Sequence, residues 1–142
     1  QMCIRDRYTH RVRFVCWHLR DFFIGEVAAM RPIPKALLIH TVTHAKEERV
    51  DRWSEGCLTD EQTLQRVRIE PSSKVVRDSN SAEIQLAATL FYDCKNSRPR
   101  GVAFTEDDII IFNGQKHKIQ LVEPLYDEGR LHHYELGLIK HA

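Results

Sequence analysis

The sequence predicts an all-β fold: a small antiparallel β-barrel or sandwich of five to seven short strands with long loops. Apolar residues recur at every second position in several short runs, which is the period of a half-buried strand. Turn-forming residues separate these runs, and Asn113-Gly114 is the dipeptide that most readily adopts positive φ at both central positions of a hairpin turn. No segment has the length and period of a core helix, so we expect at most a short helical turn near residues 59–65.

Residues 1–29 differ in character from the rest, and we expect them to be a non-native leader. The opening QMCIRDR resembles the peptide that sequencing-adapter read-through leaves in translated environmental assemblies. Gly25-Glu26-Val27 can be encoded by a purine-rich ribosome-binding sequence just ahead of the Met30 codon, which indicates untranslated sequence read in frame. Residues 30–142 are then one domain that starts at Met30. The alternative is a genuine amphipathic N-terminal helix, although its charged residues interrupt any membrane span.

Charge and cysteine content narrow the class of the protein. The formal net charge is +1, and the balance beyond residue 29 is close to neutral, so the sequence lacks the basic footprint of a nucleic-acid-binding domain. Cys57 and Cys94, the cysteines of the predicted domain, fit no metal-binding spacing and no disulfide framework. We therefore expect a protein that folds in a reducing cytosol, without a cofactor or a metal.

The first strand is predicted over residues 35–43, KALLIHTVT, which are rich in aliphatic and β-branched residues. Pro32 and Pro34 exclude a helix before it. Residues 45–63 carry many charges and only scattered apolar residues, so we expect a long excursion from the sheet, anchored by Trp53.

Three segments follow the excursion. Residues 64–69 alternate between polar and apolar and predict a second strand. Residues 74–82 are polar at their tip and predict a mobile loop or the end of a hairpin. Residues 84–94 form the longest alternating run of the chain and predict a central strand, after which residues 95–106 return to turn-forming composition.

The C-terminal part of the chain predicts three consecutive antiparallel strands. A short apolar run at residues 108–112 leads into the Asn113-Gly114 turn, and residues 116–122 carry the chain back, which makes a tight hairpin. A longer turn is expected over residues 124–130. The strand at residues 131–139 alternates, with one face suited to burial, and is expected to close the core.

The conspicuous histidines His132 and His133, with Glu135, have the chemistry of metal ligands. On a regular strand, however, neighbouring side chains point to opposite faces, so both histidines could not bind one ion, and we predict no metal site. His132 is instead predicted to be a hydrogen-bonded histidine on the inner face beside Tyr134. His133 and Glu135 are predicted to form a polar pair on the outer face.

The acidic run Glu106-Asp107-Asp108 stands directly before a strand. Paired carboxylates can act as acid and base when their environments differ, but neighbours on an extended chain point in alternate directions, so a solvated strand entrance is the prediction. No nucleophile lies in a recognisable catalytic motif, and no glycine-rich loop is suited to phosphate. No catalytic or cofactor-binding residue is predicted, and an enzyme is the least favoured class.

A small basic turn is formed by Lys95, Arg98 and Arg100. In a nearly neutral domain such cations make subunit contacts or face water. Contact with DNA phosphates is the alternative, because phosphate-binding proteins neutralise the backbone with lysine and arginine.

Several separated blocks carry a resemblance to a known family. MRPIPKALLIHTVT, VRIEPSSKVVRDSN, ATLFYDCKNSRP, IIFNGQKHKI and LHHYELGLI, in this order and spacing, resemble the minor capsid proteins encoded by siphovirus-like phages and prophages of Gram-positive bacteria. The resemblance covers residues 30–139. It implies a small β-barrel that serves as a structural protein of the virion, of the head-tail connector or head-completion type.

The resemblance also implies a place and partners. The protein would assemble in the host cytoplasm as a ring in the neck, between portal-side and tail-side phage proteins, with passing contact to genomic DNA and none to a membrane. Its polar loop at residues 74–82, with Lys74, Arg77, Asp78 and Asn80, would then face the channel or an adjoining ring. A tail-terminator or tail-completion protein is an alternative within the virion. A small OB-like nucleic-acid-binding module is another, although the sequence lacks its basic stripe and exposed aromatic face.

Overall fold

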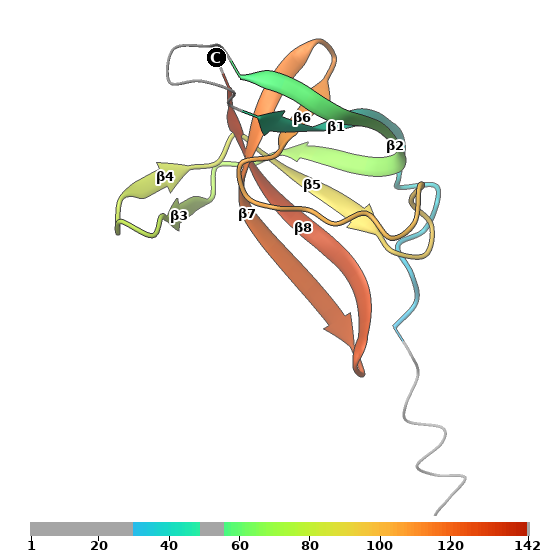
Figure 1. The fold of residues 1–142 in the computed structure, drawn as a ribbon. Helices are drawn as coiled ribbons and strands as arrows, with labels where there is room; N and C mark the ends of the chain where they lie inside the picture. Colours follow the sequence, from blue (N-terminus) through green and yellow to red (C-terminus); the bar gives the residue numbers. More distant parts are fainter. Residues whose placement is uncertain (1–29, 49–55, 142) are drawn as a thin grey trace, which may run out of the picture. The chain divides into compact units, whose positions relative to one another are not determined.

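The computed structural model describes residues 30–48 and 56–141, so the predicted leader and Trp53 lie outside the described residues. The chain divides into two compact units, Gln1–Met30 and Arg31–Ala142, and the strands belong to the second. The described part contains no helix and eight strands. These are β1 (His40–Glu48), β2 (Cys57–Pro71), β3 (Val75–Arg77), β4 (Glu83–Gln85), β5 (Ala88–Asp93), β6 (Ile109–Phe112), β7 (Gln115–Asp127) and β8 (Arg130–Lys140) (Figure 1).

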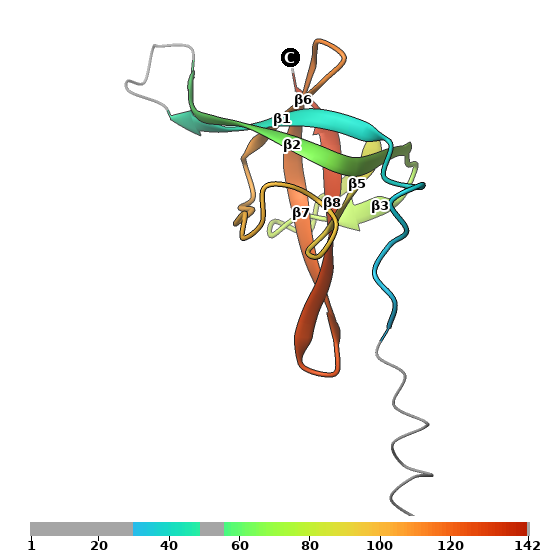
Figure 2. The ribbon, with the colours of Figure 1, turned by 90° about the vertical axis from the view of Figure 1, so that its right-hand side faces the viewer.

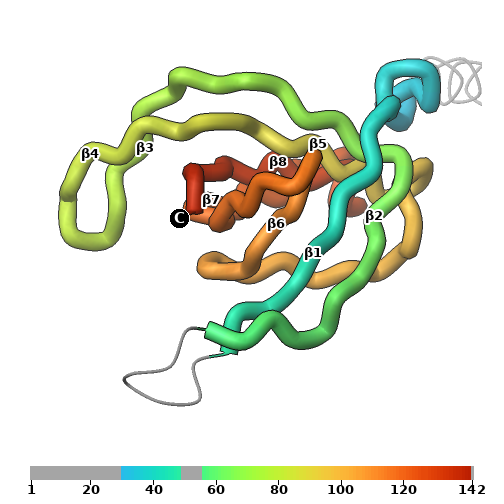
Figure 3. Tube along the Cα trace, turned by 90° about the horizontal axis from the view of Figure 1, so that it is seen from above, coloured from blue at the N-terminus to red at the C-terminus, as the bar shows by residue number. Residues whose placement is uncertain are grey.

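Six of these strands close into an antiparallel barrel in the order β1-β2-β5-β8-β7-β6. The closing contact is short and pairs residues 43–45 of β1 with residues 109–111 of β6. β3 and β4 form a separate two-stranded sheet that extends to one side of the barrel (Figure 3). The predicted all-β class is confirmed, and closure of the sheet decides between barrel and sandwich. Within the described residues, no helix is long and apolar enough to cross a membrane.

The expected excursion at residues 45–63 is wrong. β1 continues to Glu48 and β2 begins at Cys57, so residues 59–65 are extended and no helical turn forms there. The two strands pair with each other as a long ribbon, which contributes Val42, Leu64 and Val67 to the core but has no buried side chain over residues 57–63. In that stretch the bulge at Asp60 (φ 53°) breaks the alternation and the charged side chains face water, so it has no strand pattern in its sequence; a second bulge lies at Arg66 (φ 58°).

Two tight hairpins flank β7. The turn at Asn113-Gly114 has φ of 51° and 75° and joins β6 to β7, as the dipeptide predicts. The longer turn expected at residues 124–130 is wrong, because β7 runs to Asp127 and a second two-residue turn, Glu128-Gly129, leads into β8. Pro124 is tolerated inside β7 because β6 pairs with β7 only as far as Lys118, which leaves Pro124 on an edge. The β7–β8 ribbon projects beyond the barrel (Figure 2).

The central strand predicted at residues 84–94 is split in two. β4 ends at Gln85 and β5 begins at Ala88, between β2 and β8. Leu86, at the break, is buried against Gly137 of β8, where an added Cβ would lie 2.9 Å from Leu86 Cδ1. At this contact the chain passes from the β3–β4 hairpin into the barrel.

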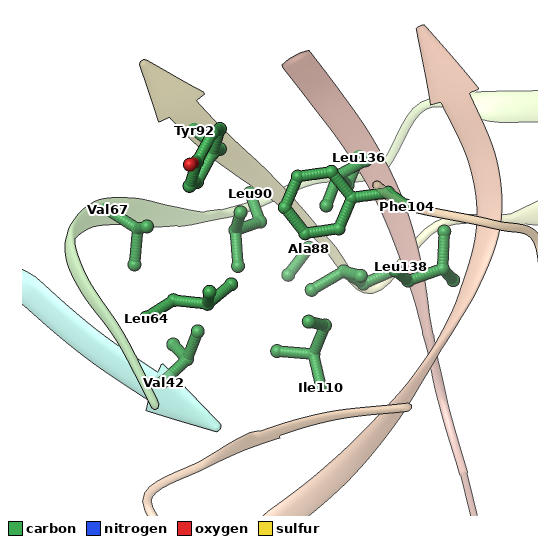
Figure 4. Close-up of a cluster of buried hydrophobic side chains, with 11 residues drawn as sticks. Val42, Leu64, Val67, Ala88, Leu90, Tyr92, Phe104, Ile110, Leu136 and Leu138 are labelled. Carbon is green, nitrogen blue, oxygen red and sulfur yellow. The ribbon is translucent and has the colours of Figure 1, made fainter. Parts of the chain in front are cut away.

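The barrel core draws side chains from all six of its strands and from the loop between β5 and β6 (Figure 4). Its members are Val42, Leu64, Val67, Ala88, Leu90, Tyr92, Phe104, Ile110, Ile119, Leu136 and Leu138. Phe104, from the loop, meets Tyr92 and Tyr134 edge-on at centroid distances of 5.1 and 5.3 Å. Tyr134 therefore packs against the core.

Candidate functional site

The basic turn, residues 94–101, follows β5 and is held by a dense set of hydrogen bonds. The amide of Ser97 donates to Asp93 O (2.9 Å) and the amide of Asn96 donates to Asp93 Oδ2 (2.8 Å). Two backbone bonds then join Arg98 and Gln65, at 2.7 and 3.0 Å, which fixes the turn to β2. These bonds give the charged side chains of the turn a fixed base.

The structure brings the three predicted cations Lys95, Arg98 and Arg100 together and adds a fourth, Arg66. The hydroxyl of Ser97 donates to the carbonyl of Arg66, which ties the β2 bulge to the turn. Arg98 Nη1 donates to the carbonyl oxygens of Lys95 (2.8 Å) and Ser97 (2.9 Å). None of the four cations forms an ion pair within the described part of the chain. Arg66 was missed because a bulge leaves no local mark in the sequence.

The polar segment at residues 74–82 is an ordered hairpin. At its base, the amide of Leu86 donates to Lys74 O (2.9 Å), and Lys74 Nζ lies 3.5 Å from Glu123 Oε2 of β7. Arg77 pairs with Glu83 at 3.6 Å across the hairpin, an exposed contact that contributes little to stability. In the turn, Asp78 Oδ1 accepts a hydrogen bond from the amide of Ser79 (2.6 Å), and Asn80 is exposed at the tip. Lys74 therefore lies at the base of the hairpin, whereas Arg77, Asp78 and Asn80 lie toward its tip.

His132 and His133 do not point to opposite faces. Leu125 pairs with His133 and Tyr126 with Leu131, so His132 is the extra residue of a bulge. Their Nδ1 atoms lie 2.7 Å apart, and His132 Nε2 lies 2.9 Å from the carbonyl of Arg31. Because a carbonyl only accepts, Nε2 of His132 donates, and a neutral His132 accepts the proton of His133 at Nδ1.

The histidine pair thus fastens the segment before β1 to β8. His133 and Glu135 form the predicted polar pair, although the distance between His133 Nε2 and Glu135 Oε1, 3.5 Å, is long for a hydrogen bond. No cluster of three or more histidine, cysteine and acidic side chains suited to a metal ion occurs among residues 30–48 and 56–141.

The acidic run before β6 is only partly a solvated entrance. Asp107 is exposed and pairs with Lys118 at 2.7 Å, but Asp108 is only 4% exposed, so the prediction is wrong for Asp108. Asp107 adopts φ 76°, which turns the next side chain inward. There Asp108 Oδ2 accepts from His44 Nε2 (2.9 Å) and from the amide of Thr105 (3.0 Å).

His44 is as deeply buried as Asp108 and also packs edge-on against Phe104, at a centroid distance of 5.3 Å. The sequence does not reveal this pair, because the two residues are 64 positions apart and neither lies in a recognisable motif. The pair links β1 to the start of β6, where the barrel closes.

Burial also sets the chemistry of the thiol at the end of β5. It raises the pKa of Cys94, and the neighbouring Asp93 carboxylate raises it further. Cys94 is therefore a protonated thiol at neutral pH, and the structure does not activate it as a nucleophile.

The chain is similar to a known protein family. A family model described as minor capsid protein matches residues 34–138, which extend from the segment before β1 into β8. No curated protein and no solved structure matches the chain.

Proposed function

Because the chain belongs to the minor capsid protein family, we propose that it is a head-tail connector, which assembles as a ring in the neck between portal and tail. Membership by itself makes the chain a structural protein of a phage capsid that assembles with other virion proteins. The position in the neck, the ring and assembly in the host cytoplasm are the proposed part.

The observation that carries the proposal is a closed barrel that holds hairpins away from itself. Because the six strands of the barrel pair with one another around its circumference, we expect contacts with other proteins to be made by its hairpins and turns. The β7–β8 ribbon presents Tyr126, 64% exposed, near its tip, and the β3–β4 hairpin extends to one side. A rotationally symmetric ring needs contacts between two different faces of identical subunits, and protruding elements suit that requirement.

In this proposal the β3–β4 hairpin faces the channel or an adjoining ring. Its base is held by the backbone bond from Leu86 to Lys74 O and by the packing of Leu86 on Gly137, so the barrel sets the direction of the hairpin. Lys95, Arg98 and Arg100 make contacts between subunits, or with DNA phosphates as the genome passes.

The experiment is to delete residues 76–81 in the phage gene and to locate the protein by immunogold electron microscopy. We expect label at the neck of wild-type particles, and mutant heads that package DNA but lose it or fail to join tails. Label at the end of the tail distal to the head, or in no particle, would contradict the connector assignment. Label where the tail joins the head in tails purified without heads would favour a tail terminator. A deletion mutant with full infectivity would exclude the role given to the hairpin.

A further inference from the structure

The strand β2 carries unpaired charge of opposite sign at its two bulges. Near the start of β2, Asp60 and Glu61 of this strand and Glu48 at the end of β1 are exposed, and none forms an ion pair among the described residues. We call these three residues the acidic edge; the exposed Lys46 lies beside them and leaves the group net negative. The second group, the basic cluster, consists of Arg66, Lys95, Arg98 and Arg100.

Asp60 and Glu61 of the acidic edge lie on a stretch of β2 that is open on one side. His44 pairs with Gln62 and Lys46 with Thr59, so Asp60 and Glu61 together face the single residue Ala45 in a bulge. β2 pairs with β5 only from Val67 onward, which leaves the outer side of residues 57–63 without a neighbouring strand. Charge and a bulge on an open strand oppose the addition of another strand. The edge is better suited to a charged turn.

The basic cluster is such a turn, and it lies on the other side of the barrel. Figures 1 and 3 show the start of β2, beside the grey segment, and the turn after β5 on opposite sides of the barrel. Hydrogen bonds already fix the backbone that carries the cations, so little further ordering of the backbone is needed on binding.

We propose that the basic cluster of one copy docks on the acidic edge of the next copy, in a head-to-tail contact. This inference rests on the proposed function, since it identifies the two faces that neighbouring subunits of the ring use. A contact between two different faces is the kind that closes into a ring. The near-neutral chain, with a complementary acidic surface of its own, favours a second copy over DNA as the partner of the cations.

The test uses sedimentation velocity of the full chain with two charge-reversed variants. The first, Glu48→Lys with Glu61→Lys, reverses the acidic edge and leaves the strained Asp60 unchanged. The second, Lys95→Glu with Arg100→Glu, leaves two cations against two carboxylates, which neutralises the basic cluster and keeps Arg98, whose guanidinium holds the turn. We expect wild-type association at low salt to weaken toward about 0.5 M salt, because the Debye length shortens. Each variant alone should associate about tenfold or more weakly, because like charges meet in the first variant and the attraction between the two faces is lost in the second.

Mixing the two variants gives the decisive result. The second variant keeps the acidic edge and the first keeps the basic cluster, so we expect the equimolar mixture to recover association as pairs of one variant with the other. The matched control, Lys116→Glu with Lys140→Glu, changes the net charge as the second variant does, at exposed residues outside both faces, and should associate as the wild type does. Circular dichroism confirms that each variant is folded.

Three outcomes would overturn the proposal: a wild-type chain that stays monomeric at low salt, variants that associate normally, or a mixture that recovers nothing. Tight, salt-sensitive binding of a labelled DNA duplex that only the second variant loses, with self-association unchanged, would assign the cations to DNA instead. The immunogold experiment is independent of these results. If the protein is labelled at the neck but both charge variants associate normally, the proposed contact is wrong and the connector assignment stands. If association depends on these charges but no label appears at the neck, the connector assignment is wrong and the contact stands.

Discussion

The buried pair of His44 and Asp108 can be tested by a double-mutant cycle. Asp108→Ala removes the acceptor of two donors, the buried His44 Nε2 and the part-buried amide of Thr105. Each buried donor left without a partner costs about 1–3 kcal/mol. We therefore expect Asp108→Ala to lower the free energy of unfolding by about 2–4 kcal/mol, a large part of a typical total of about 5–15 kcal/mol.

The second arm of the cycle is His44→Phe, which keeps the edge-on ring contact with Phe104 but removes the donor to Asp108. When Asp108 is already alanine, replacing His44 removes an unsatisfied group, so the double variant should lose less than the sum of the single losses. A coupling energy of about 1–3 kcal/mol is expected.

The measurement is urea denaturation followed by far-ultraviolet circular dichroism, with Asp108→Asn as the conservative variant. The asparagine keeps one acceptor and should fall between wild type and alanine. If the two single losses add within about 0.5 kcal/mol, His44 and Asp108 do not stabilise each other and the argument is refuted. A loss below about 1 kcal/mol for Asp108→Ala would have the same consequence.

Three further predictions concern packing and ionisation. Gly137→Ala should destabilise the protein by about 1–3 kcal/mol, because the new Cβ meets Leu86 at 2.9 Å; hydrogen exchange should rise at the base of the β3–β4 hairpin, and unchanged exchange there would contradict the contact. In a chain that starts at Met30, Ellman's reagent should label the exposed Cys57 quickly and Cys94 only after unfolding, since burial raises the pKa of the Cys94 thiol; Cys57→Ser should remove the fast phase. Burial also raises the pKa of Tyr92, so its contribution to stability is complete below the unfolded pKa of about 10 and is lost as pH rises through the folded pKa. The urea midpoint should therefore fall on going to more alkaline pH, and less so in Tyr92→Phe; an equal fall in both would assign the effect to other groups.

Local sequence decided those features whose cause is local. Asn113-Gly114 predicts its hairpin because both residues tolerate positive φ, and the alternation over residues 131–139 predicts β8 because one face must be buried. The blocks that resemble minor capsid proteins lie in the part of the chain matched by that family. The clustering of Lys95, Arg98 and Arg100 is likewise visible from their spacing.

Only the tertiary structure decided where bulges fall and which distant residues meet. The start of β2, residues 57–63, has no buried side chain, because pairing of its backbone with β1 and not burial makes it a strand, so its sequence resembled a loop. A bulge brought His132 against His133, another set Arg66 beside the basic turn, and the closing of the barrel buried Asp108 against His44. These contacts depend on register between strands far apart in the chain, and register is set by the assembled sheet as a whole.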